Sequence, residues 1–245
     1  MQSSTTQNIA TIFKQVAYEK AKVTLTGIRT QACEDQFVGL LKIERKNAHF
    51  TQWIKTSLTD ANLRQSMHDE LEQQTNIPVL AIILESPHKQ EYAGNIPMPA
   101  CGKTGDNIYK LLPKYLNCIS ATLEQDNISQ GVGFPDIQSG TYRVLLINAI
   151  QYQCSLGEKT KKYRDEILDK MWENGDVRTD FANRLTIHPL RVIINCCTAS
   201  ATNFRKKIQK VISNSINCCD TALFHAYHPC QWQPCIAIEP GMWKN

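Results

Sequence analysis

The sequence predicts an α/β fold of three layers (αβα), in which helices cover both faces of a central, mostly parallel sheet of four strands. Four apolar runs of strand length are spread along the chain, and segments with helical patterns lie between them. Strands and helices that alternate at this spacing are typical of a parallel sheet. The first run, residues 79 to 84, suits a strand buried on both faces and is too short to span a membrane.

Residues 1 to 75 are predicted to form an N-terminal helical extension, and residues 76 to 245 the α/β domain. The region from about residue 8 to 75 carries two apolar stripes at helical spacing. The first stripe consists of Ile9, Ile12, Phe13, Val16 and Ala17, and the second of Phe37, Leu40, Leu41, Phe50 and Ile54. Thr59 and Asp60 form a start signal for one more helix.

The rest of the chain supplies the alternating elements. A loop with proline and glycine covers residues 92 to 103, and a helix with a capped start follows from residue 104. A polar loop is expected at residues 124 to 140. Further strands are predicted at residues 142 to 149, 192 to 196 and 222 to 228, with helices at residues 163 to 172 and 201 to 213 between them.

Composition limits the class of protein. The chain of 245 residues is 42% hydrophobic and 20% charged, as in ordinary globular proteins. It holds no apolar run of about 20 residues and begins without the features of a secretory signal, so we expect a cytoplasmic protein without a membrane partner. The ten cysteines are read as reduced thiols. Their adjacent pairs, Cys196-Cys197 and Cys218-Cys219, do not suit a zinc site, so no metal or other cofactor is expected.

The net charge of +4 permits a polyanionic partner without requiring one. Basic clusters at residues 159 to 164 and 205 to 210 either contact phosphates or are solvated helix faces. Residues 102 to 104 match the end of a phosphate-binding loop, but Pro97 stands where that loop needs glycine, which argues against a nucleotide triphosphatase. The helix start near Asp106 and Asn107 remains a possible anion site.

Three polar residues follow predicted strands and are the catalytic candidates: Glu85, Asn148 and His228. Ligands of such folds bind at the carboxyl ends of the strands. A carboxylate can orient water or stabilise a cation, an amide can donate and accept hydrogen bonds, and a histidine can stabilise a leaving anion. Taken singly, Glu85 could pair with a lysine, Asn148 could cap a helix, and His228 could be a core imidazole. Together the three favour cleavage at a heterocycle.

Four motifs, in their order and spacing, resemble the uracil-DNA glycosylase superfamily over roughly residues 77 to 240. Leu84-Glu85-Ser86-Pro87-His88 is similar to the family's Gly-Glu-Ala-Pro-Gly after a strand, and residues 104 to 110 resemble its Ser-Leu-Lys-Asn-Ile-Tyr helix start. Leu146-Ile147-Asn148 resembles its Leu-Leu-Asn. The segment His228-Pro229-Cys230-Gln231-Trp232-Gln233 resembles its His-Pro-Ser-Pro-Leu-Ser loop.

The resemblance implies a monofunctional DNA glycosylase, which flips a base out of double-stranded DNA and hydrolyses its N-glycosidic bond to leave an abasic site. Glu85 would position water and stabilise the cationic sugar, Asn148 would read the base edge, and His228 would donate to the departing base. Trp232 either takes the place of the family's wedge residue or is an ordinary packed indole. Contacts to substrate or DNA are expected from Ser86, Pro87, His88, Lys103, Thr104, Asn107, Gln231 and Trp232.

Two departures from the family motif affect the expected substrate. Ser86 replaces its Asp or Ala, and His88 replaces the Tyr or Gly that shapes the pocket. We therefore expect a non-standard or modified pyrimidine, as for phage-defence enzymes that excise glucosylated hydroxymethylcytosine. The alternatives are a uracil or mismatch repair glycosylase and a catalytically inactive module that binds DNA. No protein partner is indicated.

Overall fold

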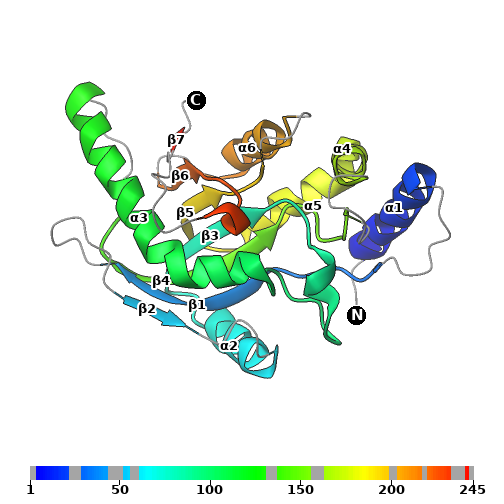
Figure 1. The fold of residues 1–245 in the computed structure, drawn as a ribbon, viewed down its shortest axis with the longest axis horizontal. Coiled ribbons are helices and arrows are strands. Elements are labelled where there is room, and N and C mark those ends of the chain that lie inside the picture. The colour runs from blue at the N-terminus through cyan, green and yellow to red at the C-terminus, as the bar shows by residue number, and fades with distance from the viewer. Residues whose placement is uncertain are drawn as a thin grey trace.

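The computed structural model describes residues 4–21, 29–43, 52–55, 61–130, 137–155, 163–198, 203–216, 220–232 and 241–242. They form one sheet flanked by helices (Figure 1). No helix in these ranges combines the length and the apolar character that a membrane crossing requires.

The sheet has seven strands, of which the central four are parallel. The strand order is β2 (Gln52–Lys55), β1 (Gln36–Ile43), β4 (Gly140–Asn148), β3 (Val79–Leu84), β5 (Leu190–Asn195), β6 (Ala222–His225) and β7 (Gly241–Met242). The four predicted strands are β3, β4, β5 and β6, so the predicted fold class is confirmed. The sheet is wider than predicted because β1 and β2 on one side and β7 on the other add antiparallel strands.

Strand β3 lies at the centre, and all six of its residues are buried. Successive side chains of a strand point to opposite faces, so Val79, Ala81 and Ile83 enter one core and Leu80, Ile82 and Leu84 the other. The first core also contains buried residues of α1 (Ser4–Ala21), α4 (Arg164–Glu173), α5 (Gly175–Thr186) and α6 (Phe204–Ser215). The second is covered by the long helix α3 (Lys103–Gln130), which crosses the sheet in Figure 1.

The first predicted apolar stripe is confirmed in α1, where Ile9, Phe13 and Ala17 are buried. The prediction that residues 8 to 75 are mostly helical is wrong for β1 and β2, although α2 (Ala61–Gln73) packs against β1. Phe37, Leu40 and Leu41 lie in β1 and Ile54 in β2, while Phe50, Thr59 and Asp60 lie outside the described residues. Periodicity alone does not tell whether a short apolar run forms a helix or a buried strand. The segment of residues 36 to 43 is a strand because it pairs with β4.

Two further predictions about the helices need correction. The polar loop expected from residue 124 is wrong up to Gln130, because α3 continues to that residue. Adding residues to an existing helix needs no new nucleation step, so a polar segment can prolong it. Helix α5 was not predicted as a separate element, whereas the helices predicted from residues 163 and 201 correspond to α4 and α6.

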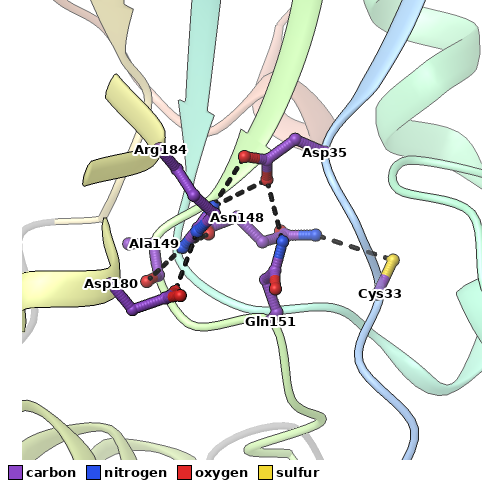
Figure 2. A network of polar contacts seen from close by, with 7 residues as sticks. All are labelled: Cys33, Asp35, Asn148, Ala149, Gln151, Asp180 and Arg184. Atoms are coloured by element: carbon purple, nitrogen blue, oxygen red, sulfur yellow. Dashed lines mark hydrogen bonds and ion pairs between the residues drawn. The ribbon is translucent and has the colours of Figure 1, made fainter. Parts of the chain in front are cut away.

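Arg184 of α5 joins three parts of the chain through a buried polar network (Figure 2). Its guanidinium donates to both carboxylate oxygens of Asp35, at 2.7 and 2.8 Å, and to Asp180 at 2.9 Å. It also donates to the carbonyls of Asn148, at 3.1 Å, and Ala149, at 3.2 Å. Burial raises the pKa of Asp35, and Arg184 opposes that rise. The network thereby attaches the end of β4 to the segment that precedes β1.

The end of β4 in turn holds the end of β3. Ala149 N–H donates to the Leu84 carbonyl at 2.8 Å, and Ile150 N–H donates to the Glu85 carbonyl at 3.0 Å. On the other side of β3, Cys196 N–H donates to the Ile83 carbonyl at 2.9 Å. The backbone that carries Glu85 is therefore fixed by both neighbouring strands.

We expect Arg184→Met to lower the free energy of unfolding by about 3–5 kcal/mol, because it leaves the Asp35 carboxylate buried without a cation. Urea unfolding would measure the change. The double variant Asp35→Asn/Arg184→Met leaves only the partly exposed Asp180 without its cation and should recover part of the loss. A single variant as stable as the natural chain would contradict the assigned role of this network.

Candidate functional site

A pocket of ≈ 420 Å³ opens at the carboxyl ends of β3, β5 and β6, beside the first turn of α3. Its volume falls in the range of small-molecule sites, roughly 300–1,000 Å³. Eight of the eleven predicted site residues line it, namely Glu85, Ser86, Pro87, His88, Lys103, Thr104, His228 and Gln231. Asn107, Asn148 and Trp232 do not.

Seven lining residues were not predicted as site residues: Gln90, Glu91, Gly102, Ser155, Arg164, Thr198 and Cys230. Arg164 is the last residue of the first basic cluster, residues 159 to 164, for which contact with phosphates was one of the two interpretations of the sequence. Residues 159 to 162 of that cluster lie outside the described residues. Thr198 follows β5, a strand end that the sequence reasoning left unused.

The carboxylate of Glu85 is held on both of its oxygens. Thr198 donates to Oε1 from its backbone N–H, at 2.6 Å, and from its hydroxyl. Arg164 Nη1 lies 3.6 Å from Oε2. Glu85 is only 5% exposed, so these contacts compensate a buried charge. Its cation is an arginine from α4 rather than the lysine considered above.

His228 is set up as a neutral hydrogen-bond donor. Its Nδ1 accepts from the backbone N–H of Cys230 at 3.3 Å, so the proton of the neutral ring is assigned to Nε2. No described residue accepts a hydrogen bond from Nε2. Burial lowers the pKa of His228, with Glu85 acting to raise it and Arg164 to lower it further. The ring is therefore neutral at pH 7 and faces the pocket.

Glu91 connects the two ends of the pocket wall formed by residues 88 to 100. It belongs to the short 3-10 helix η1 (Lys89–Tyr92). Its Oε2 accepts from the His88 N–H at 2.8 Å, and its Oε1 accepts from the Ala100 N–H. Ala100 has φ 57°, a left-handed conformation that residues other than glycine adopt infrequently. Burial raises the pKa of Glu91 to about 7.

The start of α3 forms another side of the pocket. The capped helix predicted there is present and begins at Lys103. A side chain at Gly102 would occupy the place of the Gln90 carboxamide, so the flexible Gln90 side chain would have to move to admit another residue there. The amino end of a helix favours anions, and Lys103 adds a positive charge.

Asn107 acts one turn further along α3, outside the pocket. Its Nδ2 donates to the Pro229 carbonyl at 2.7 Å and lies 3.4 Å from the Trp232 carbonyl. These contacts hold the 3-10 helix η2 (Pro229–Gln231), which follows His228, against α3. Asn107 thus positions the histidine loop and has no direct place in the pocket.

Asn148, the third catalytic candidate, does not line the pocket that Glu85 and His228 share. Asn148 is 1% exposed, and its Nδ2 lies 3.8 Å from the sulfur of Cys33 (Figure 2). Its Oδ1 has no hydrogen-bond partner among the described residues. Asn148 is the register partner of Leu84 in the neighbouring strand, so the two side chains lie on the same face of the sheet. Successive side chains along a chain alternate between faces, so the side chain of Glu85, which follows Leu84, points the other way.

Trp232 is a packed indole, the second of the two alternatives considered for it, and it does not line the pocket. It is 4% exposed and stacks on Tyr115 of α3, with ring centroids 4.7 Å apart and planes inclined by 5°. Its Nε1 donates to the Tyr227 carbonyl at 2.9 Å. Tyr227, which precedes His228, is instead 50% exposed.

Two residues of the second basic cluster, Arg205 and Lys207, make contacts within the fold. Arg205 donates to the Cys197 carbonyl at 2.6 Å and to the Ala226 carbonyl at 3.1 Å, and so joins the ends of β5 and β6. Lys207 pairs with Asp169 of α4 at 2.8 Å.

Within the described ranges, no group of three or more His, Cys, Asp or Glu side chains is arranged to hold a metal ion. Comparisons of the chain with protein families, with curated proteins and with solved structures give no match. The chemistry of the pocket is therefore argued from its own residues.

Trp232→Ala should lower the free energy of unfolding by about 3–5 kcal/mol, because it removes a large buried ring and leaves a cavity beside Tyr115. The half-exposed Tyr227→Ala is the matched control and should change stability by no more than about 0.5 kcal/mol. Urea unfolding distinguishes the two. Equal effects of the two variants would contradict the packing described for Trp232.

Glu91 should make stability depend on pH. Because its pKa is about 7 in the fold and near 4.5 in the unfolded chain, its contribution is fully present below about pH 4.5 and is lost as the pH rises through about 7. The loss amounts to up to about 3 kcal/mol. The difference in unfolding free energy between the natural chain and Glu91→Gln, measured from pH 4.5 to 8, should change by that amount. A difference independent of pH would contradict the buried state of Glu91.

Proposed function

We propose that the protein is a DNA glycosylase that flips a modified or non-standard pyrimidine out of duplex DNA, hydrolyses its N-glycosidic bond and leaves an abasic site. The proposal is supported most by the pocket that the Glu85 carboxylate and the neutral His228 imidazole share. The order and spacing of the sequence motifs support the same reaction.

The two residues suit the two charges that the reaction develops. As the bond between C1′ and the base nitrogen breaks, its electron pair leaves with the base and the sugar becomes cationic. The oxygen of a water molecule, oriented by Glu85, forms the new bond to C1′, and the water proton passes to Glu85 and then to solvent. His228 Nε2–H donates a hydrogen bond to the departing base anion, which solvent then protonates.

Several groups around the pocket favour a polyanionic substrate. Lys103 and the first turn of α3 present positive potential at one side, and the Arg164 guanidinium lies at another. A phosphate next to the flipped nucleotide fits this arrangement. Affinity for DNA should therefore fall as salt concentration rises.

The polar wall of the pocket favours a base that carries a polar substituent. Ser155 is 3% exposed, lines the pocket, and its hydroxyl has no partner among the described residues. Gln90, Gln231 and His88 add further donors and acceptors. A site with unpaired buried polar groups selects a ligand that pairs with them. Glucosylated hydroxymethylcytosine of phage DNA is such a base, and its removal would serve antiviral defence.

One observation favours a second candidate, a glycosylase-like module that binds DNA without releasing a base. Asn148, proposed from the motif resemblance to read the base edge, is buried away from the pocket. In an active enzyme the base edge would be read instead by side chains such as Gln90 or Ser155. The third candidate, a uracil or mismatch repair glycosylase, shares the reaction and differs in the base.

The candidates are distinguished by incubating the protein with duplex oligonucleotides that carry uracil, hydroxymethylcytosine or glucosylated hydroxymethylcytosine, followed by alkaline cleavage at abasic sites. We expect cleavage of the glucosylated substrate. Glu85→Gln and His228→Ala should each reduce the rate by about 100-fold or more, because each removes a group that acts on charge in the transition state.

Glu173→Gln, an exposed carboxylate on the far end of α4, is the matched control and should retain the full rate. Fluorescence anisotropy at a fixed salt concentration should show that the two pocket variants still bind DNA. Cleavage of the uracil substrate alone would exclude the modified base. Binding of all three substrates without cleavage would instead identify the binding module.

A further inference from the structure

Arg164 is the first residue of α4 and lines the pocket from a helix, whereas Glu85 follows the end of a strand. Its Nη1 lies 3.6 Å from Glu85 Oε2, and its Nε donates to Asp165 Oδ1 at 2.9 Å. The Arg164 side chain is 18% exposed and that of Glu85 is 6% exposed. The contact therefore joins a cation at the pocket rim to an anion inside it.

Among the residues that the structure describes, Arg164 and His228 are the two possible cationic partners of Glu85. Arg164 is permanently charged, and His228 lines the same pocket and becomes a cation if it binds a proton. A buried carboxylate that lacked Arg164 would draw a proton onto His228. Because the opposite charges of this pair largely cancel, the pocket would stabilise a cationic sugar only weakly.

The other groups that act on this pair do not replace Arg164. The thiols of Cys154, Cys197 and Cys230 interact with Glu85, and burial raises the pKa of each, so they stay neutral at pH 7. Lys103, from α3, acts on the thiol of Cys230. Thr198 donates hydrogen bonds to Glu85 and carries no charge.

We propose that Arg164 is a positioning residue whose charge keeps the His228 ring neutral beside the Glu85 carboxylate. The direction of the pKa shifts agrees with this arrangement, since Glu85 acts to raise the pKa of His228 and Arg164 acts to lower it. The catalytic consequence rests on the proposed glycosylase function. The protonation state itself is a property of the protein alone.

The direct test is an NMR titration of the His228 ring in the natural chain, Arg164→Gln and Arg164→Lys, with the resonance assigned from His228→Gln. Arg164→Gln should raise the titration midpoint of His228 by about one pH unit or more, because it removes a like charge beside the ring and leaves the Glu85 anion uncompensated. Arg164→Lys keeps the charge and should restore most of the natural midpoint.

Two controls separate charge from structure. Arg191→Gln removes one positive charge near the amino end of β5, whereas the pocket lies at the carboxyl end, and should leave the midpoint unchanged. Thr198→Val removes a hydrogen bond to Glu85 but no charge, and should move the midpoint much less than Arg164→Gln. Thermal unfolding would establish that every variant is folded at the titration temperature.

In the glycosylase assay, the acid limb of kcat/KM should move to higher pH in Arg164→Gln by the same amount as the His228 midpoint, which a purely structural role would not produce. An unchanged midpoint in Arg164→Gln, or equal midpoints in the Gln and Lys variants, would overturn the proposal. If the midpoint moves as expected but no base is released from any DNA, the proposed function fails and the role of Arg164 stands.

Discussion

The guanidinium of Arg184 is the contact on which the arrangement of the site depends. It binds Asp35, ahead of β1, and the carbonyls at the end of β4, so three segments far apart in the sequence meet at one buried side chain. The end of β4 then holds Glu85 through the Ile150 N–H. A buried ion pair is weak evidence for added stability, but it specifies one arrangement, because any other leaves charges without partners.

Sequence patterns anticipated the parallel centre of the sheet and the position of Glu85, which directly follows the apolar run of β3. They placed His228 at the end of a strand, whereas β6 ends at His225 and His228 lies three residues further on. They did not anticipate β1, whose apolar run becomes a strand only by pairing with β4, about a hundred residues later. Nor did they anticipate Arg164 beside Glu85, because that contact depends on how α4 packs on the sheet. Asn148 was misplaced for a related reason, since residue spacing does not reveal which face a strand end presents.

The two principal site residues are held by different means. Glu85 is surrounded by side-chain and backbone donors from α4 and the end of β5, whereas His228 is oriented by its own loop, which Asn107 fastens to α3. The wall opposite depends on Glu91. Each part of the pocket is thus supported from a separate element, and the pocket exists only when all of these elements are packed together.

The pairing of β1 with β4 also has a consequence for the order of assembly. During synthesis, β1 emerges early and can pair with β2, but its other edge stays open until β4 has been made. The Arg184 contact to Asp35 spans 149 positions and forms later still. Contacts of such long range slow folding, and an open apolar strand edge invites association between chains. The N-terminal strand is therefore the part of this chain that most needs protection before the fold is complete.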